Sequence, residues 1–145
     1  VLGWEVSNTM DSGMCLVALE RALQTTGKVP GILNTDQGSQ FTSKEWTEKL
    51  VGVDVKISMD GKGRWTDNVF IERLWRSLKY EDIYLREYDT IKKITEGIRI
   101  WFERYNNWRP HQALQNETPD AIYSKRKIIE GTRIRRGGTV KTKIV

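Results

Sequence analysis

Cysteine and histidine are scarce in this 145-residue chain, and their scarcity excludes several kinds of functional site. Cys15 is the single cysteine, so no internal disulfide can form. Its place in an apolar helical pattern favours a buried thiol in a reducing compartment. His111 is the single histidine. A zinc site built from histidines is therefore excluded, and so is a serine–histidine–aspartate triad unless His111 is its base.

Long hydrophobic runs are absent as well. No apolar stretch of the sequence approaches the roughly 20 residues that a membrane-spanning helix needs. No signal peptide is visible either. We therefore expect no membrane partner.

Charge is unevenly distributed along the chain. Charged residues make up 30% of it and the formal net charge is +5, which favours a polyanionic partner without requiring one. From residue 125 onward eight basic residues stand against one acid, whereas residues 1–124 carry a net charge of −2. We expect residues 1–124 to form a domain and residues 125–145 to form a basic, poorly ordered tail. That tail is either solvated or in contact with phosphates.

Residue patterns predict a mixture of helices and strands. Residues 53–57 alternate between apolar and polar, as in a half-buried strand, and residues 42–45 fit a capping box with Thr42 as the cap. The predicted strands are 1–6, 32–34 and 53–57. The predicted helices are 14–23, 42–51, one that Asp67 caps, 90–105, and a short one that Thr118 caps.

The first candidate site residue is Asp36. It follows the apolar run at residues 31–33 and precedes Gly38. This pattern is typical of a carboxylate at the carboxyl end of a strand, where the chain turns away.

The second candidate is Glu72, in the helix that Asp67 is expected to cap. One face of this helix is apolar, and the opposite face carries Asn68, Glu72, Arg76 and Lys79. A carboxylate followed by cations suits a metal ligand beside phosphate-binding groups. The alternative is a solvated face with a Glu–Arg pair four residues apart.

A basic loop with two glycines precedes this helix and carries Lys62 and Arg64. Such loops often contact a phosphate backbone, although a plain surface turn has the same composition.

Several runs together resemble insertion-sequence transposases with a retroviral-integrase-like (DDE-type) core. They are NTDQGSQFTS at 34–43, SMDGKG at 58–63, DNVFIE at 67–72 and YNNWRPHQAL at 105–114. The 35 residues between Asp36 and Glu72 match the family's spacing of its second aspartate and its glutamate. Lys79 occupies the position at which this family carries a basic residue that contacts DNA. The similarity covers roughly residues 1–123.

The resemblance implies an α/β, ribonuclease-H-like fold, with residues 1–124 as a partial integrase-type catalytic core followed by a helical and basic extension. It implies DNA transposition by metal-dependent phosphodiester cleavage and strand transfer. The cofactor would be Mg²⁺ or Mn²⁺, with two ions in a complete site, because hard cations prefer oxygen ligands. The catalytic and metal-binding residues would be Asp36 and Glu72, and the DNA-binding residues Lys62, Arg64, Asn68, Arg76 and Lys79.

One departure from the family concerns the third carboxylate. The family's first aspartate lies upstream of the motif that opens this chain, and Glu5, Asp11 and Glu20 do not replace it convincingly. We therefore expect the chain to lack the first two of five strands and to be inactive alone. The Asp36 strand would then present an exposed edge that favours self-pairing.

The expected partners are DNA (transposon ends and target), a second copy of the chain as homo-oligomer, and an upstream polypeptide that completes the core. The expected location is the bacterial cytoplasm, in association with the nucleoid. Two other functions stay open. One is a non-catalytic DNA-binding module. Its affinity for duplex DNA would fall as the salt concentration rises and would not change with Mg²⁺ or in Glu72→Ala. The other is a two-carboxylate hydrolase of another substrate such as a sugar, with Trp65 and Trp108 in its cleft.

Overall fold

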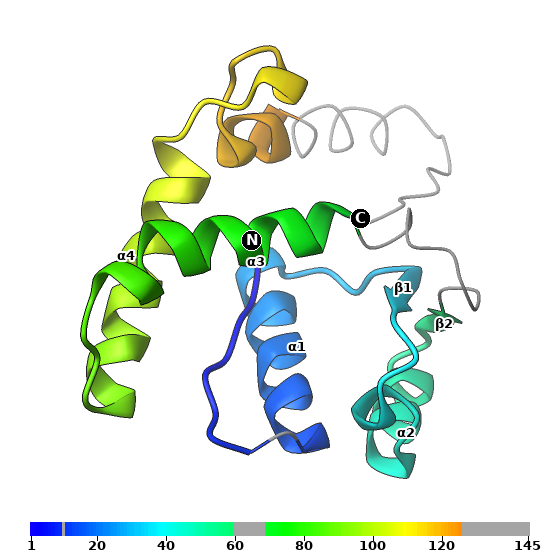
Figure 1. Cartoon of the computed structure of the whole chain (residues 1–145). Helices are drawn as coiled ribbons and strands as arrows, with labels where there is room; N and C mark the ends of the chain where they lie inside the picture. The colour runs from blue at the N-terminus through cyan, green and yellow to red at the C-terminus, as the bar shows by residue number, and fades with distance from the viewer. Residues whose placement is uncertain (10, 60–68, 126–145) are drawn as a thin grey trace. The chain divides into compact units, whose positions relative to one another are not determined.

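A computed structural model describes residues 1–9, 11–59 and 69–125 (Figure 1). The described chain divides into two compact units. The amino-terminal unit runs from Leu2 to Tyr80, and the carboxyl-terminal unit contains Val1 and the residues from Glu81 onward.

The amino-terminal unit is built on two parallel strands, β1 (Ile32–Thr35) and β2 (Lys56–Met59). Between them the chain forms a 3₁₀ turn, η1 (Ser39–Phe41), and helix α2 (Lys44–Gly52). Parallel strands need such a crossover, because the chain must return from the end of the first strand to the start of the second. A tight turn is too short to do this. This strand–helix–strand arrangement confirms the expected mixture of helix and strand.

The core of this unit lies between the strands and helices α1 (Ser12–Thr26) and α2. Its most buried side chains are Leu19, Trp46, Leu50 and Val55. The Trp46 ring meets Phe41 edge to face, with 5.2 Å between the ring centroids. The predicted apolar face of the first helix is confirmed, because Leu16 and Leu23 pack beside Leu19.

Residues 1–6 do not form the predicted strand. The segment from Leu2 instead lies against α1, where a Cβ on Gly3 would collide with the backbone of Ala18 and Ala22. Arg21 on α1 donates to the carbonyl oxygen of Trp4 at 3.0 Å and pairs with Glu5 at 2.7 Å. The segment that was predicted as a strand therefore contacts a helix, and no described strand pairs with it.

Two further boundaries differ from the prediction. The cap of α2 is Ser43, whose hydroxyl accepts from the backbone N–H of Trp46 at 3.3 Å, so the capping box at Thr42 is wrong by one residue. The strand predicted at 53–57 begins at Lys56, because Asp54 adopts a left-handed φ of 58° and continues the turn that ends α2.

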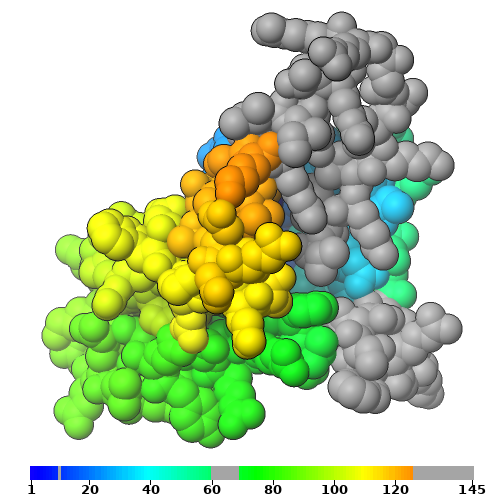
Figure 2. Space-filling model, turned by 90° about the horizontal axis from the view of Figure 1, so that it is seen from above, coloured from blue at the N-terminus to red at the C-terminus, as the bar shows by residue number. Residues whose placement is uncertain are grey.

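Helix α3 (Val69–Glu81) ends at the boundary between the units. The carboxyl-terminal unit continues with η3 (Ile83–Leu85), helix α4 (Ile91–Asn107) and η4 (Gln112–Leu114), and residues 119–125 are helical. The predicted cap at Thr118 is consistent with the backbone N–H of Ala121, which donates to its hydroxyl. Thr90 also caps α4, by accepting from the N–H of Lys93. In Figure 2 the yellow and orange side chains of this unit lie side by side.

His111 packs in the carboxyl-terminal unit with its ring edge-on to Tyr105, 4.7 Å between centroids. Its Nε2 is buried and has no hydrogen-bond partner among the described residues. Burial lowers the pKa of His111, and the positive charge of Arg109 lowers it further. The folded protein therefore favours the neutral ring.

We predict that this unit loses stability on acidification through His111. The unfolded chain takes up the proton near its ordinary pKa of 6.5, at a higher pH than the folded chain. The contribution of His111 is thus complete above that pH and declines as the pH falls below it. Urea unfolding at about pH 7.5 and about pH 5 should show a smaller decline for His111→Gln than for wild type. Equal declines would contradict the assignment.

Some expectations lie outside the described residues. These are the loop with Lys62 and Arg64, the cap Asp67, Asn68, and the tail from residue 126 onward. Within the described ranges, no helix is long and apolar enough to cross a bilayer.

Candidate active site and nucleic-acid interface

Asp36 lies directly after β1, as the sequence predicts. Because β1 and β2 are parallel, with Thr35 opposite Met59, both strands end at the same edge of the sheet. The exposed Asp36 side chain accepts a hydrogen bond from the N–H of Gly38 through Oδ1 at 2.8 Å. This turn fixes the carboxylate at the strand end and leaves Oδ2 without a hydrogen bond from any described residue.

The surroundings of Asp36 are partly apolar. Burial raises the pKa of the nearby Cys15 thiol, and the negative charges of Asp11 and Asp36 raise it further. Thr35, which precedes Asp36, is buried, and its hydroxyl has no hydrogen-bond partner among the described residues. Cys15 packs against the core but is partly rather than fully buried, and the raised pKa favours its protonated form.

Glu72 lies in the first turn of α3 and is exposed. No described residue forms an ion pair with it, although Arg76 stands one turn further along the helix. The Arg76 guanidinium lies over the ring of Tyr80 instead, 5.8 Å from its centroid. The Glu72–Arg76 pair, which was the alternative explanation of this face, is therefore not formed.

The opposite, apolar face of α3 is mostly open. Leu78 is 1% exposed, whereas Phe70 is 66% exposed and Trp75 43%. Lys79 is exposed in the last turn and has no acidic partner among the described residues. Among the described residues, the helix thus carries an unpaired carboxylate at Glu72, three exposed cations (Arg73, Arg76 and Lys79) and solvent-exposed aromatic rings.

The structure describes only part of the predicted site. Asp36, Glu72, Arg76 and Lys79 all belong to the amino-terminal unit, and no described hydrogen bond or ion pair links the two carboxylates. Within the described ranges no group of three His, Cys, Asp or Glu side chains is placed to hold a metal ion. The other three predicted DNA contacts are among the residues that the structure does not describe.

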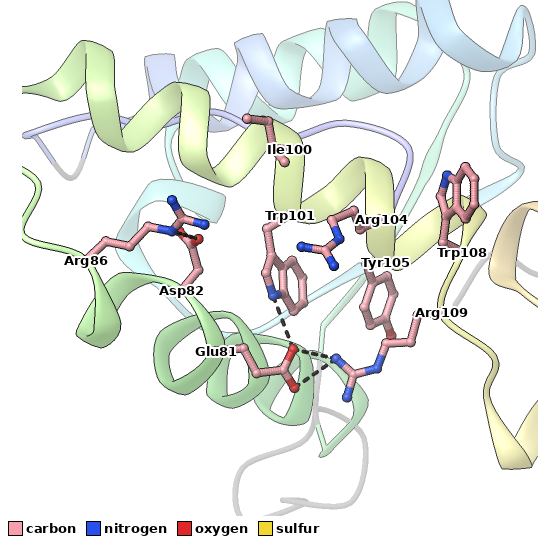
Figure 3. A pocket seen from close by; sticks show the side chains of 9 residues that line it. All are labelled: Glu81, Asp82, Arg86, Ile100, Trp101, Arg104, Tyr105, Trp108 and Arg109. Atoms are coloured by element: carbon pink, nitrogen blue, oxygen red, sulfur yellow. Dashed lines mark hydrogen bonds and ion pairs between the residues drawn. The ribbon is translucent and has the colours of Figure 1, made fainter.

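Sequence reasoning missed a pocket in the carboxyl-terminal unit. Figure 3 shows it between the end of α3 and one face of α4, with a volume of about 440 Å³. Its lining residues are Glu81, Asp82, Arg86, Ile100, Trp101, Arg104, Tyr105, Trp108 and Arg109. The helical spacing of residues 101, 104, 105 and 108 was a signal for this face, but no residue pattern indicates that the facing acids bind arginines.

Two protein-family models match the chain, and both are described as an integrase core domain. One matches residues 1–64 and the other residues 53–119. Together they extend over β1, Asp36, α3 and α4. The fold and these matches define a protein with an integrase core, which implies a ribonuclease-H-like fold.

Similar proteins show to which group of integrase-core proteins the chain belongs. A transposase for insertion sequence element IS904 from Lactococcus lactis subsp. lactis (strain IL1403) is 32% identical over 121 residues, which are 82% of this chain and 48% of that protein. Transposase InsF for insertion sequence IS3A from Escherichia coli (strain K12) is 28% identical over 127 residues, or 86% of this chain and 44% of the relative. The chain belongs to the insertion-sequence transposases with an integrase-like core. It spans about half the length of these relatives or somewhat less.

Proposed function

We propose that this chain contributes to DNA transposition, by phosphodiester cleavage and strand transfer, and that Asp36 and Glu72 are its catalytic carboxylates. The observation that carries this proposal is the state of Glu72. An exposed carboxylate one turn from an arginine ordinarily forms a pair worth a few tenths of a kcal/mol. Here Arg76 lies over Tyr80, and no described residue pairs with Glu72, which leaves its carboxylate available to another positive group.

The donor chemistry of these residues fits Mg²⁺ or Mn²⁺. Both offer carboxylate oxygens, which hard divalent cations prefer, and Oδ2 of Asp36 is not engaged by the turn at Gly38. Two bound ions would supply activation of the attacking hydroxyl and stabilisation of the leaving oxygen. The role of the protein groups is to hold two negative charges at the strand end and on the helix.

Arg76 and Lys79 would hold DNA phosphates on the same helix. Their spacing from Glu72 places all three on one side of α3. We extend this interface to Lys62, Arg64 and Asn68, which precede the helix in the sequence. Transposon ends and target DNA are the proposed substrates, and the nucleoid in the bacterial cytoplasm is the proposed location.

We also propose that the chain does not cleave DNA by itself. The resemblance implies three carboxylates, and Asp36 and Glu72 are the two that match. The proposed protein partner is a second copy of the chain, as a homo-oligomer. We keep residues 1–124 as the partial core and 125–145 as the basic tail.

The first test measures binding of a fluorescent DNA duplex by fluorescence anisotropy at several salt concentrations, with and without Mg²⁺. Neutralising both cations in Arg76→Gln/Lys79→Gln should weaken binding and reduce the salt slope by about 2, since each phosphate contact contributes about 0.9. The matched control is Lys44→Gln/Lys92→Gln, which removes two exposed cations from α2 and α4. It should change binding much less.

The outcome also separates this proposal from a non-catalytic DNA-binding module. A catalytic carboxylate pair near the phosphates should repel DNA without Mg²⁺, so Glu72→Gln should raise affinity in metal-free buffer. The proposal would be contradicted, and the non-catalytic module favoured, if duplex affinity did not change with Mg²⁺, in Glu72→Gln or in Arg76→Gln/Lys79→Gln.

A further inference from the structure

The pocket of the carboxyl-terminal unit has an uneven charge balance. Arg109 binds Glu81 through Nη1 at 2.8 Å and 2.6 Å, and the indole of Trp101 donates to the same carboxylate at 3.2 Å. Arg86 pairs with the buried Asp82 at 2.8 Å. Each acid of the lining is therefore neutralised by an arginine.

Arg104 is the cation left over. It lines the pocket from α4, is exposed, and has no acidic partner among the described residues. The lining consequently carries one net positive charge, on a guanidinium that can bind a phosphate bidentately.

Trp108 is the second unusual feature of this pocket. Its side chain is 79% exposed, the most of any large apolar residue among those that the structure describes. Its backbone is nevertheless fixed, because its N–H donates to the carbonyl of Arg104 at 2.9 Å and caps α4. In Figure 3 the indole stands apart from the Glu81–Arg109 pair. A large flat ring is thus held in solvent one helical turn from an unpaired arginine.

The pocket floor is rigid and aromatic. Trp101 is 9% exposed, and its ring stacks on Tyr105 with 5.1 Å between centroids and 22° between planes. Polar contacts at both ends hold this stack, through Glu81 at Trp101 and through Arg109, which lies over Tyr105. The floor therefore presents a preformed surface beside Arg104 and Trp108.

We propose that this pocket binds an unpaired nucleotide of single-stranded DNA, with the base stacked on Trp108 and the adjacent phosphate on Arg104. An indole face and a nearby guanidinium are the groups that bind single strands without reading sequence. A base inside a duplex is stacked on its neighbours and cannot offer its face. The choice of DNA rests on the proposed function, since strand cleavage and transfer expose unpaired ends. Its lining residues belong to the carboxyl-terminal unit, whereas Asp36, Glu72 and the α3 cations belong to the amino-terminal unit.

The test compares binding of fluorescein-labelled oligo(dT) and of a blunt duplex of equal length to the full chain, by anisotropy. Trp108→Ala should weaken oligo(dT) binding about 5- to 100-fold, the usual effect of losing one stacked base, and leave duplex binding nearly unchanged. Trp108→Phe should restore most of the affinity. Arg104→Gln should weaken oligo(dT) binding and lower its salt slope by about 0.7.

Trp75→Ala is the matched control, because it removes a 43% exposed indole from α3. It should bind oligo(dT) as wild type does. As a second readout, photocrosslinking with 5-iododeoxyuridine should attach the strand to Trp108. Wild-type oligo(dT) affinity in Trp108→Ala, or a crosslink confined to other residues, would overturn the proposal. If duplex affinity is unchanged in Arg76→Gln/Lys79→Gln while Trp108→Ala still weakens oligo(dT) binding, the proposed α3 interface is contradicted and the proposal for the pocket is supported.

Discussion

Glu72→Gln and Asp36→Asn are each expected to weaken Mn²⁺ binding by this chain about tenfold or more. Each substitution removes one negative charge and one anionic oxygen ligand while nearly preserving side-chain shape. Loss of groups that merely support a metal ligand already weakens binding about 10- to 100-fold, so loss of a ligand should do at least as much. Titration with Mn²⁺, followed by electron paramagnetic resonance of the free ion, gives the affinities directly.

Glu45→Gln is the control for this prediction. Glu45 is an exposed carboxylate in the first turn of α2, as Glu72 is in the first turn of α3. General attraction of a cation to surface acids would make both substitutions equivalent. A specific role for Asp36 and Glu72 requires that Glu45→Gln retain wild-type affinity. An equal loss in the control would contradict the assignment.

The second large effect concerns the core that positions Asp36. Leu50→Ala should destabilise the amino-terminal unit by about 2–5 kcal/mol, because the Leu50 side chain is 0% exposed and its loss leaves a cavity. Leu50 also accepts backbone hydrogen bonds from Val53 and Val55, which lead into β2. Its packing therefore supports the turn between α2 and the strand beside β1.

Val51→Ala is the matched control on the same helix, since Val51 is 67% exposed. Its free energy of unfolding should stay within about 0.5 kcal/mol of wild type. Urea unfolding monitored by circular dichroism measures both variants. A loss below 1 kcal/mol for Leu50→Ala would mean that this core does not hold the strands as described.

The helices were predictable from sequence because their apolar residues repeat with helical spacing. Leu19 and Leu50 are buried as that spacing requires, and Gly27 ends α1 with a left-handed φ of 64°. The position of Asp36 was predictable as well, since a short apolar run followed by a turn residue marks a strand end.

The features that could not be predicted from sequence depend on tertiary packing. Residues 1–6 have strand-like composition, but the space that Gly3 leaves against α1 is visible only in three dimensions. Because Asp54 adopts a left-handed conformation, β2 begins at Lys56 and not at the predicted residue 53. Apolar periodicity does not reveal such a turn. For the candidate site, the spacing of residues on α3 identified Glu72 and Arg76 but not whether they pair.

The pocket of the carboxyl-terminal unit shows the same limit. Trp108 and Arg104 fall on one helical face by spacing, yet their availability depends on which arginines the acids at 81 and 82 bind. The Glu81–Arg109 pair joins residues 28 apart in the sequence, whereas Asp82 and Arg86 are only four apart. A pattern within one helix therefore could not reveal that Arg104 has no acidic partner in the part of the chain that the structure describes.

The central claim is that Asp36 and Glu72 hold a divalent metal together. Paramagnetic broadening by Mn²⁺, measured on the backbone amides of the isotope-labelled chain, tests it most directly because it requires no catalytic turnover. We predict that low Mn²⁺ broadens the amide of Gly38 and the amides of the first turn of α3 at the same metal concentration, and that either Glu72→Gln or Asp36→Asn abolishes both effects. Broadening at only one of the two places, or equal broadening at Glu45, would contradict the claim.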